Sequence, residues 1–337
     1  MVRTLALSAA CLVPLPALAQ QVHVTIDEEL ARQAGLDPSE LEIDLDGELH
    51  DVLHLDDLSA FLDAQANAST LAVRGMGVDY ASNVEWGVIG GSLGTGIDAG
   101  GFRFDRGGPS LPEYGYAFQA TAMAGINLGV WTGGEGFLSR VVLYGNGMAL
   151  GTSGEIFDGS LVNVGGHVQL KVVEPKGEGV VTWGGLDLTS GFERSRYEAR
   201  LRHPLPVEIP GTDGRASWDG TGTLTLGAAT NAVPVEISTN ARLLLFTIFG
   251  GGGLDLVTGT ADGAIDLSGD VTAEVDGQPM RIGTASVTYA DQGEPVEVFP
   301  RVFAGLQVNV LPVKVVAQLH AGLNHGVAGS VGLRLAR

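Results

Sequence analysis

The feature that most constrains the fold is a long alternation of apolar with polar or small residues, which begins near residue 84. In residues 313–324 and 162–172, apolar side chains alternate with a face that carries Lys314, Gln318 and His320, or His167, Gln169 and Lys171. A period of two is typical of β-strands. Soluble strands run about 5–6 residues, whereas about 9–11 are needed to cross a membrane obliquely. The alternation therefore favours membrane-spanning strands.

Hydropathy supports the same prediction. The mean hydropathy is +0.21 and the chain has 51 glycines, yet no apolar segment after residue 19 is long enough for a spanning helix. We expect an all-β fold, a transmembrane antiparallel β-barrel of about 12–14 strands with a small N-terminal helical plug. A secreted β-sandwich or β-solenoid is the alternative for such glycine-rich alternation.

The first 19 residues have the pattern of a secretory signal peptide. A positive charge at Arg3 precedes an apolar stretch, and Ala17 and Ala19 frame a cleavage site before Gln20. The lone Cys11 lies inside this segment, so the exported chain would have neither disulfides nor thiolate metal ligands. We expect a protein of the cell outer membrane of a Gram-negative bacterium.

Residues 20–83 differ in composition from the rest of the chain. Residues 21–83 hold 14 acidic residues and four of the 51 glycines. Helix starts are predicted at Asp27 and at Pro38, and a third helix over residues 48–66. We predict an acidic helical plug over residues 20–83 and a barrel over residues 84–337.

Prolines and aromatic residues refine the barrel prediction. Pro204 and Pro279 are expected between strands, where a missing N–H donor does little harm. The aromatic residues expected at the two membrane interfaces are Tyr114, Tyr116, Trp131, Phe299 and Phe303.

Two glycine-rich motifs point to chemistry only weakly. Gly90–Gly94 matches the G-x-S-x-G nucleophile elbow, but the glycine-rich residues after it do not predict the required helix. Residues 250–257 fit one unit of a calcium-binding repeat that works only in tandem. Asp262, Asp266 and Asp270 are interpreted as a solvated acidic loop, with weak calcium binding as the alternative.

No other cluster predicts a catalytic or metal site. His50 and His54 stand one helical turn apart without a third ligand, and Asp44–Gly47 is an incomplete calcium loop. We therefore expect no enzyme activity, no metal and no cofactor.

Charge and strand faces define the expected partners. A net charge of −20 argues against nucleic acid, which requires basic patches. Membrane lipid is the expected partner of the apolar faces. The lumen-facing candidates are His167, Gln169, Lys171, Lys314, Gln318 and His320.

The order of parts resembles that of FadL-type outer-membrane proteins: a signal peptide, a mainly helical N-terminal hatch and then a barrel. The small residues of 66–77 are similar to that family's link from hatch to first strand, but Ser82-Asn83-Val84 stands in place of its Asn-Pro-Ala step. The resemblance implies an outer-membrane channel or transporter for small or hydrophobic compounds. The alternative is a secreted structural or adhesive β-protein with acidic, calcium-binding loops.

Overall fold

The computed structural model describes residues 18–52, 58–98, 114–177, 180–209, 212, 216–275, 278–310, 312–323 and 326–336. Most of the signal-peptide prediction and His54 lie outside them, and no side chain is described for His50. The described residues include no helix that is long and apolar enough to span a membrane.

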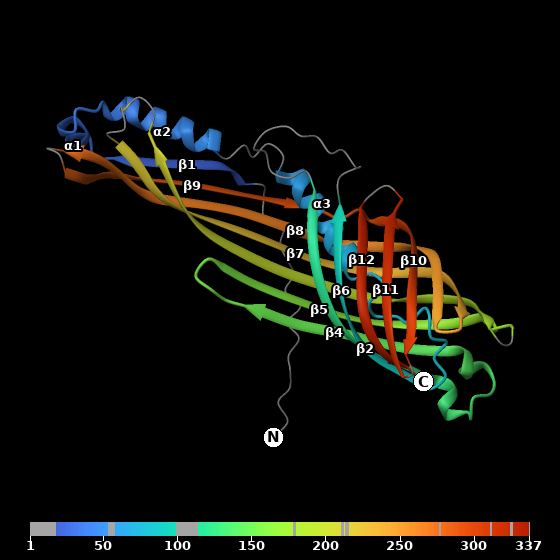
Figure 1. The fold of residues 1–337 in the computed structure, drawn as a ribbon. Helices are drawn as coiled ribbons and strands as arrows, with labels where there is room; N and C mark the ends of the chain where they lie inside the picture. Colours follow the sequence, from blue (N-terminus) through green and yellow to red (C-terminus); the bar gives the residue numbers. More distant parts are fainter. Residues whose placement is uncertain are drawn as a thin grey trace, which may run out of the picture.

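The described residues form three α-helices, twelve strands and two short 3₁₀ helices, which Figure 1 shows in their arrangement. Their bounds are α1 Glu28–Gln33, α2 Pro38–Val52, α3 Leu58–Ala72, η1 Leu128–Trp131 and η2 Phe137–Arg140; β1 Leu18–Ile26, β2 Gly87–Asp98, β3 Gly115–Asn127, β4 Val141–Thr152, β5 Phe157–Val173, β6 Val181–Glu208, β7 Ala216–Leu243, β8 Phe246–Val275, β9 Gln278–Gly293, β10 Val298–Val310, β11 Val313–Gly322 and β12 Val327–Ala336.

Ten strands close a ring in which every neighbouring pair is antiparallel. The order is β7-β8-β10-β11-β12-β2-β3-β4-β5-β6, and β6 returns to β7. The antiparallel barrel is therefore confirmed, and its twelve-stranded sheet agrees with the expected strand number. The described strands form one sheet that closes on itself, unlike the two facing sheets of a sandwich.

The ring closes because β8 changes partner along its length. Its residues 246–256 pair with β10, while residues 261–275 pair with β9. Beyond the change of partner, β6, β7 and β8 leave the ring and continue as a projecting sheet with β9 and β1 at its edge. We call this projection the flap, and the end of the ring from which it leaves the flap end.

Helices α1 and α2 cover one face of the flap. Asp27 caps α1 by accepting hydrogen bonds from the amides of Glu29 and Leu30, both at 3.1 Å, and Pro38 opens α2. Both predicted helix starts are confirmed. The expected third helix was wrong in its bounds, because α2 continues to Val52 and α3 begins only at Leu58.

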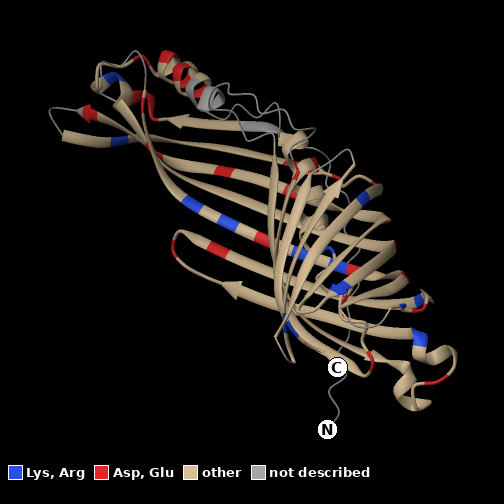
Figure 2. Cartoon of the chain, turned by 45° about the vertical axis from the view of Figure 1, so that its right-hand side comes forward, with Lys and Arg blue, Asp and Glu red and all other residues tan. Residues whose placement is uncertain are grey.

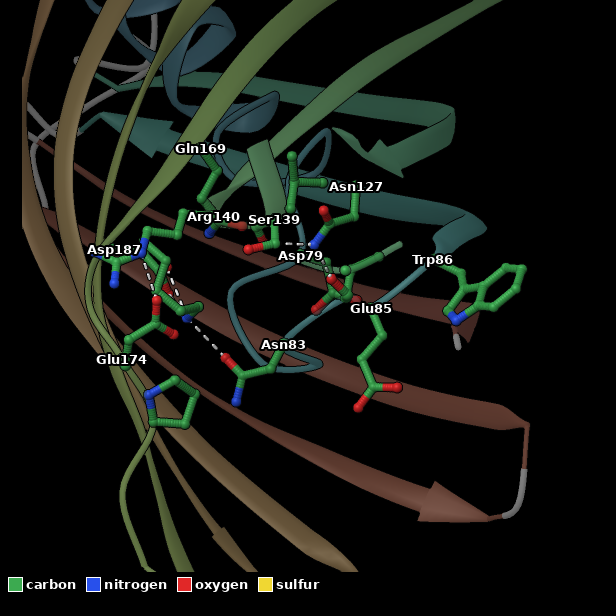
Figure 3. A pocket seen from close by; sticks show the side chains of 15 residues that line it. Asp79, Asn83, Glu85, Trp86, Asn127, Ser139, Arg140, Gln169, Glu174 and Asp187 are labelled. Carbon is green, nitrogen blue, oxygen red and sulfur yellow. Dashed lines mark hydrogen bonds and ion pairs between the residues drawn. The ribbon is translucent and has the colours of Figure 1, made fainter. Parts of the chain in front are cut away.

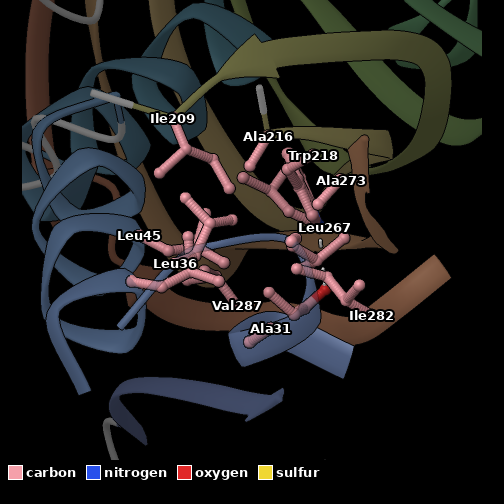
Figure 4. Close-up of a cluster of buried hydrophobic side chains, with 14 of the residues drawn as sticks. Ala31, Leu36, Leu45, Ile209, Ala216, Trp218, Leu267, Ala273, Ile282 and Val287 are labelled. Atoms are coloured by element: carbon pink, nitrogen blue, oxygen red, sulfur yellow. Dashed lines mark hydrogen bonds between the residues drawn. The ribbon is translucent and has the colours of Figure 1, made fainter. Parts of the chain in front are cut away.

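An apolar cluster joins these helices to the flap (Figure 4). Trp218, Leu267 and Val271 of the sheet are buried with Leu41 and Leu45 of α2. The helices thus cover the apolar face of the extended β7, which continues the inward, buried face of the same strand in the ring.

Two further expectations about the flap were wrong. Asp262, Asp266 and Asp270 do not lie in a loop, because they occupy the exposed face of β8. Pro204 and Pro279 lie inside β6 and β9. Pro204 is tolerated because β6 extends beyond its pairing with β5, which ends at Leu201, and so forms a free edge there.

The outer face of the ring is apolar. Its exposed large hydrophobic side chains, which we call the apolar belt, are Ile89, Leu93, Ile97, Phe118, Val162, Val164, Val168, Leu188, Phe192, Val235, Ile237, Leu254, Val302, Leu306, Val315, Leu319, Val331 and Leu333. β2 has 12 residues, which corresponds to a height of about 30 Å at a rise of about 3.3 Å per residue and a tilt of about 40°.

Aromatic side chains border the belt at both ends. Tyr114 and Tyr116 are exposed at the flap end, and Trp86 and Trp131 at the opposite end. Phe299 and Phe303, which were also expected at an interface, are buried because they belong to the inward half of β10.

Candidate functional site in the barrel lumen

A segment of the chain itself occupies the lumen. α3 contacts β2, β3, β7, β8, β9 and β12, and residues 73–84 continue from it to the end of the ring opposite the flap. Every residue from 64 to 81 is buried. We call residues 58–84 the plug.

Small residues let α3 approach the wall. Ala64, Ala68 and Ala72 form one stripe of the helix at a spacing of four residues, and they face Gly115, Gly96 and Gly94. A Cβ at Gly96 would collide with the carbonyl of Ala68, and one at Gly94 would lie 2.6 Å from the carbonyl of Ala72. The wall glycines therefore provide the space for the helix.

Polar side chains of α3 bond to backbone groups around it. Gln65 donates to the carbonyl of Tyr116 at 2.7 Å and accepts from its amide at 2.9 Å, as a neighbouring strand would. Asn67 accepts from the amide of Val296 at 2.8 Å. These bonds fix both the position and the rotation of α3.

Between α3 and the end of the ring opposite the flap, buried ion pairs link the plug to the wall strands. Arg74 pairs with Glu193 on β6 and, at 2.9 Å, with Asp255 on β8. Farther along the plug, the guanidinium of Arg334 on β12 donates to the carboxylate of Asp79 at 3.1 Å. All five side chains are at most 5% exposed.

Arg301 on β10 is the centre of this network. Its Nε donates to Asp255 at 2.8 Å, Nη2 donates to Glu236 on β7, and Nη1 lies 2.8 Å from Nδ1 of His320 on β11. Because a guanidinium only donates, Nδ1 of His320 accepts, and the imidazole is neutral. Tyr80 of the plug donates to Glu236 at 2.6 Å. The network thus joins the plug to wall strands on several sides.

The sequence-predicted lumen candidates all lie on the inward half of their strands. His167 is 3.3 Å from Glu193, and Gln169 accepts from Tyr144 at 2.9 Å. Gln318 is 2.6 Å from His320, while Lys314 is half-buried farther along β11.

Lys171 lines a cavity of 380 Å³ at the end of the ring opposite the flap (Figure 3). Its Nζ lies 2.8 Å from Asp187 and 3.0 Å from Asn83 of the plug. Arg140 and Glu174 form a 2.6 Å ion pair among the same lining residues. The cavity therefore has a fixed, mainly polar lining.

Sequence reasoning missed the central charges, which are Arg74, Asp79, Glu193, Glu236, Asp255, Arg301 and Arg334. For Glu236 and Arg301, the signal was a lone charge among uncharged residues on the inward half of an alternating segment. Asp255, which lies in the single unit that fits a calcium-binding repeat, pairs with Arg74 and Arg301.

The nucleophile-elbow pattern has a structural role. Ser92 lies in the middle of β2 with strand residues on both sides. The motif therefore lacks the strand-to-helix turn that projects a nucleophile. Among the described residues, no group of three or more His, Cys, Asp or Glu side chains has an arrangement that could hold a metal ion.

The fold and its interior define a class of protein: an antiparallel β-barrel with an apolar outer face and a lumen occupied by a buried segment of its own chain. The chain belongs to the Lsa36-like family, whose model matches residues 19–336. No curated protein sequence matches it.

Several solved structures match this chain at low sequence identity. The translocator domain of the autotransporter NalP from Neisseria meningitidis is 12% identical over 89% of this chain and 97% of that chain, with a TM-score of 0.30. The Ralstonia pickettii toluene transporter TbuX is 10% identical over 80% and 92%, with a TM-score of 0.24. Ail of Yersinia pestis is 9% identical over 75% and 97%, with a TM-score of 0.22.

Proposed function

We propose that the protein is an outer-membrane channel that its plug closes at rest. The observation that carries the proposal is the uninterrupted burial of residues 64–81 inside a closed ring. An apolar belt about 30 Å high between aromatic borders fits the hydrocarbon core of a bilayer. Passage of a solute then requires the plug to move.

The orientation follows from the two ends of the ring. Away from the flap, two residues separate β7 from β8 and β10 from β11, and β12 ends there, while residues 128–140 between β3 and β4 form a longer connection at this end. Outer-membrane barrels have short periplasmic turns and longer extracellular loops. The flap then stands on the outer surface, with α1 and α2 upon it, and the chain enters the lumen from that side.

The solute is proposed to be small and polar. The lumen groups between α3 and the end of the ring opposite the flap are charged or hydrogen-bonding. If α3 is displaced, it leaves an opening of about 10 Å, the diameter of a helix with its side chains. A hydrophobic solute, which the resemblance to FadL-type proteins implies, is the second candidate. We also propose a division of the chain at residue 83, between the acidic helical segment of residues 20–83 and the barrel of residues 84–337. The two parts are linked, because β1 of the first pairs with β9 of the second.

Planar-bilayer recordings test the closed state. Replacing residues 61–79 by a Gly/Ser linker of equal length is expected to produce steady conductance, because the linker cannot fill the lumen as a packed helix does. The wild-type chain should conduct only rarely. A matched control replaces residues 28–46 on the flap by the same linker and should remain closed.

Equal conductance of the wild type and the variant without the plug would contradict the closed-channel proposal. Heat-modifiable migration on a gel shows separately that each variant has formed its barrel. Adding small polar and small aromatic solutes to the open variant, and measuring the block of current, then distinguishes the two solute classes.

A further inference from the structure

The border of the apolar belt at the flap end is basic on β6. The outward residues Leu188 and Phe192 are 42% and 47% exposed and belong to the belt. Farther along the same face of β6 lie four arginines and one acid: Arg194, Arg196, Glu198, Arg200 and Arg202. Figure 2 shows these charges in a row on the strand where it leaves the ring.

This row is unusual in a chain with a net charge of −20 and 19 basic residues in all. Arg196 pairs with Glu198 at 2.9 Å, but both side chains are more than half exposed, so the pair is weak. Arg202 pairs with Asp158 of β5 at 2.8 Å. Within the described part of the chain, Arg194 has no ion pair.

The surroundings of Arg194 and Arg196 are amphipathic. Their neighbours on β5 are Val164 and Val162, which are both exposed members of the belt. The aliphatic stems of the arginines therefore border apolar surface while their guanidinium groups reach the level of lipid headgroups, as basic residues do at a membrane interface.

A groove of 430 Å³ lies beside Arg194 on the outer wall. Apolar side chains of the groove include Phe192, Val233, Leu256 and Val298. At the border of the belt, the groove is also lined by Asn231, which lies opposite Arg194 in the register of β6 and β7. Glu297 also lines the groove, from the segment before β10. The shape offers an acyl chain a recess beside Arg194.

We propose that this face binds a phosphorylated lipid of the outer leaflet. Its phosphate lies on Arg194 and Arg196, and one acyl chain lies in the groove. A guanidinium binds phosphate oxygens in a bidentate manner, which suits Arg better than Lys at such a site. The proposal rests on the proposed membrane position of the barrel, with the flap on the outer side.

Native mass spectrometry of the detergent-solubilised full chain tests it with lipid A as the probe. The double variant Arg194→Gln/Arg196→Gln is expected to bind lipid A about thirtyfold more weakly, at roughly 1 kcal/mol for each basic residue near a charged headgroup. The control Arg32→Gln/Arg281→Gln removes the same charge from exposed ion pairs on the flap and should bind like the wild type.

Two further probes define the ligand. Phosphatidylethanolamine should bind weakly and equally to all three proteins, and millimolar inorganic phosphate should not displace lipid A. Equal binding of lipid A to the double variant and the control would overturn the proposal. Displacement by inorganic phosphate would also overturn it, because the site would then bind a free anion.

Insertion into liposomes is measured on the same proteins by protection from protease. A wild-type chain that does not insert contradicts the proposed membrane function, whatever lipid A does in detergent. If the chain inserts, but the wild type and the double variant bind lipid A equally, only the proposed lipid site is contradicted.

Discussion

Replacing Arg301 by methionine is expected to lower the free energy of unfolding by about 3–5 kcal/mol, because it removes the cation that two buried carboxylates share. Asp255 and Glu236 both bond to this guanidinium, and all three side chains are at most 2% exposed. Among the described residues, Asp255 keeps Arg74 as a partner, whereas Glu236 keeps the hydroxyl of Tyr80 alone. Urea unfolding of the reconstituted barrel, followed by tryptophan fluorescence, measures the change.

Arg281→Met is the matched control. Arg281 forms a 2.9 Å ion pair with Asp270 on the flap, but both side chains are more than half exposed. Such pairs contribute at most about 1 kcal/mol. A loss for Arg301→Met as small as that for the control would show that the lumen is hydrated and that the network does not hold the plug.

The second large effect is expected at a glycine of the lumen wall. Gly96→Val places a side chain against the backbone of α3, since a Cβ there would collide with the Ala68 carbonyl and lie 2.9 Å from the amide nitrogen of Ala72. Overpacking of this kind costs about 1–3 kcal/mol or more. We expect the barrel to unfold at lower temperature on heat-modifiability gels, and α3 to become sensitive to protease.

Gly91→Val makes the same change on the opposite face of the same strand. The nearest atom to its Cβ is the carbonyl of Thr121 at 3.5 Å, an ordinary contact. Valine also suits a strand better than glycine does. The control should match or exceed the wild type in stability, and equal losses for the two variants would mean that α3 does not pack on β2.

The strands themselves were largely predictable from the sequence. Over the described residues of 162–172 and 313–323, the alternation assigned the side chains to the faces that they take, because a period of two leaves only two choices. It did not predict the flap. The apolar half of residues 217–226 has the same pattern as the belt, but it continues the inward half of β7, and the helices that cover Trp218 make it a core.

The lumen network was not predictable, because its contacts join residues far apart in the sequence. Asp79 and Arg334 are 255 positions apart, and Tyr80 and Glu236 are 156 apart. Register and ring closure decide such pairs, and neither follows from local pattern. The spacing of Ala64, Ala68 and Ala72 is visible in the sequence. That glycines of β2 and β3 face these alanines could not be predicted, because it depends on where α3 lies in the ring.

Site-directed spin labelling along β5 tests the central claim most directly. The sequence has one cysteine, Cys11, in the predicted signal peptide. Once Cys11 is absent, a single cysteine introduced at any of positions 161–170 can be labelled selectively. In liposomes, labels at Val162, Val164 and Val168 should be accessible to oxygen, which dissolves in acyl chains, while labels at His167 and Gln169 should be shielded from it. Equal shielding of both sets, as in two sheets packed face to face, would contradict a barrel that has lipid outside and its own plug within.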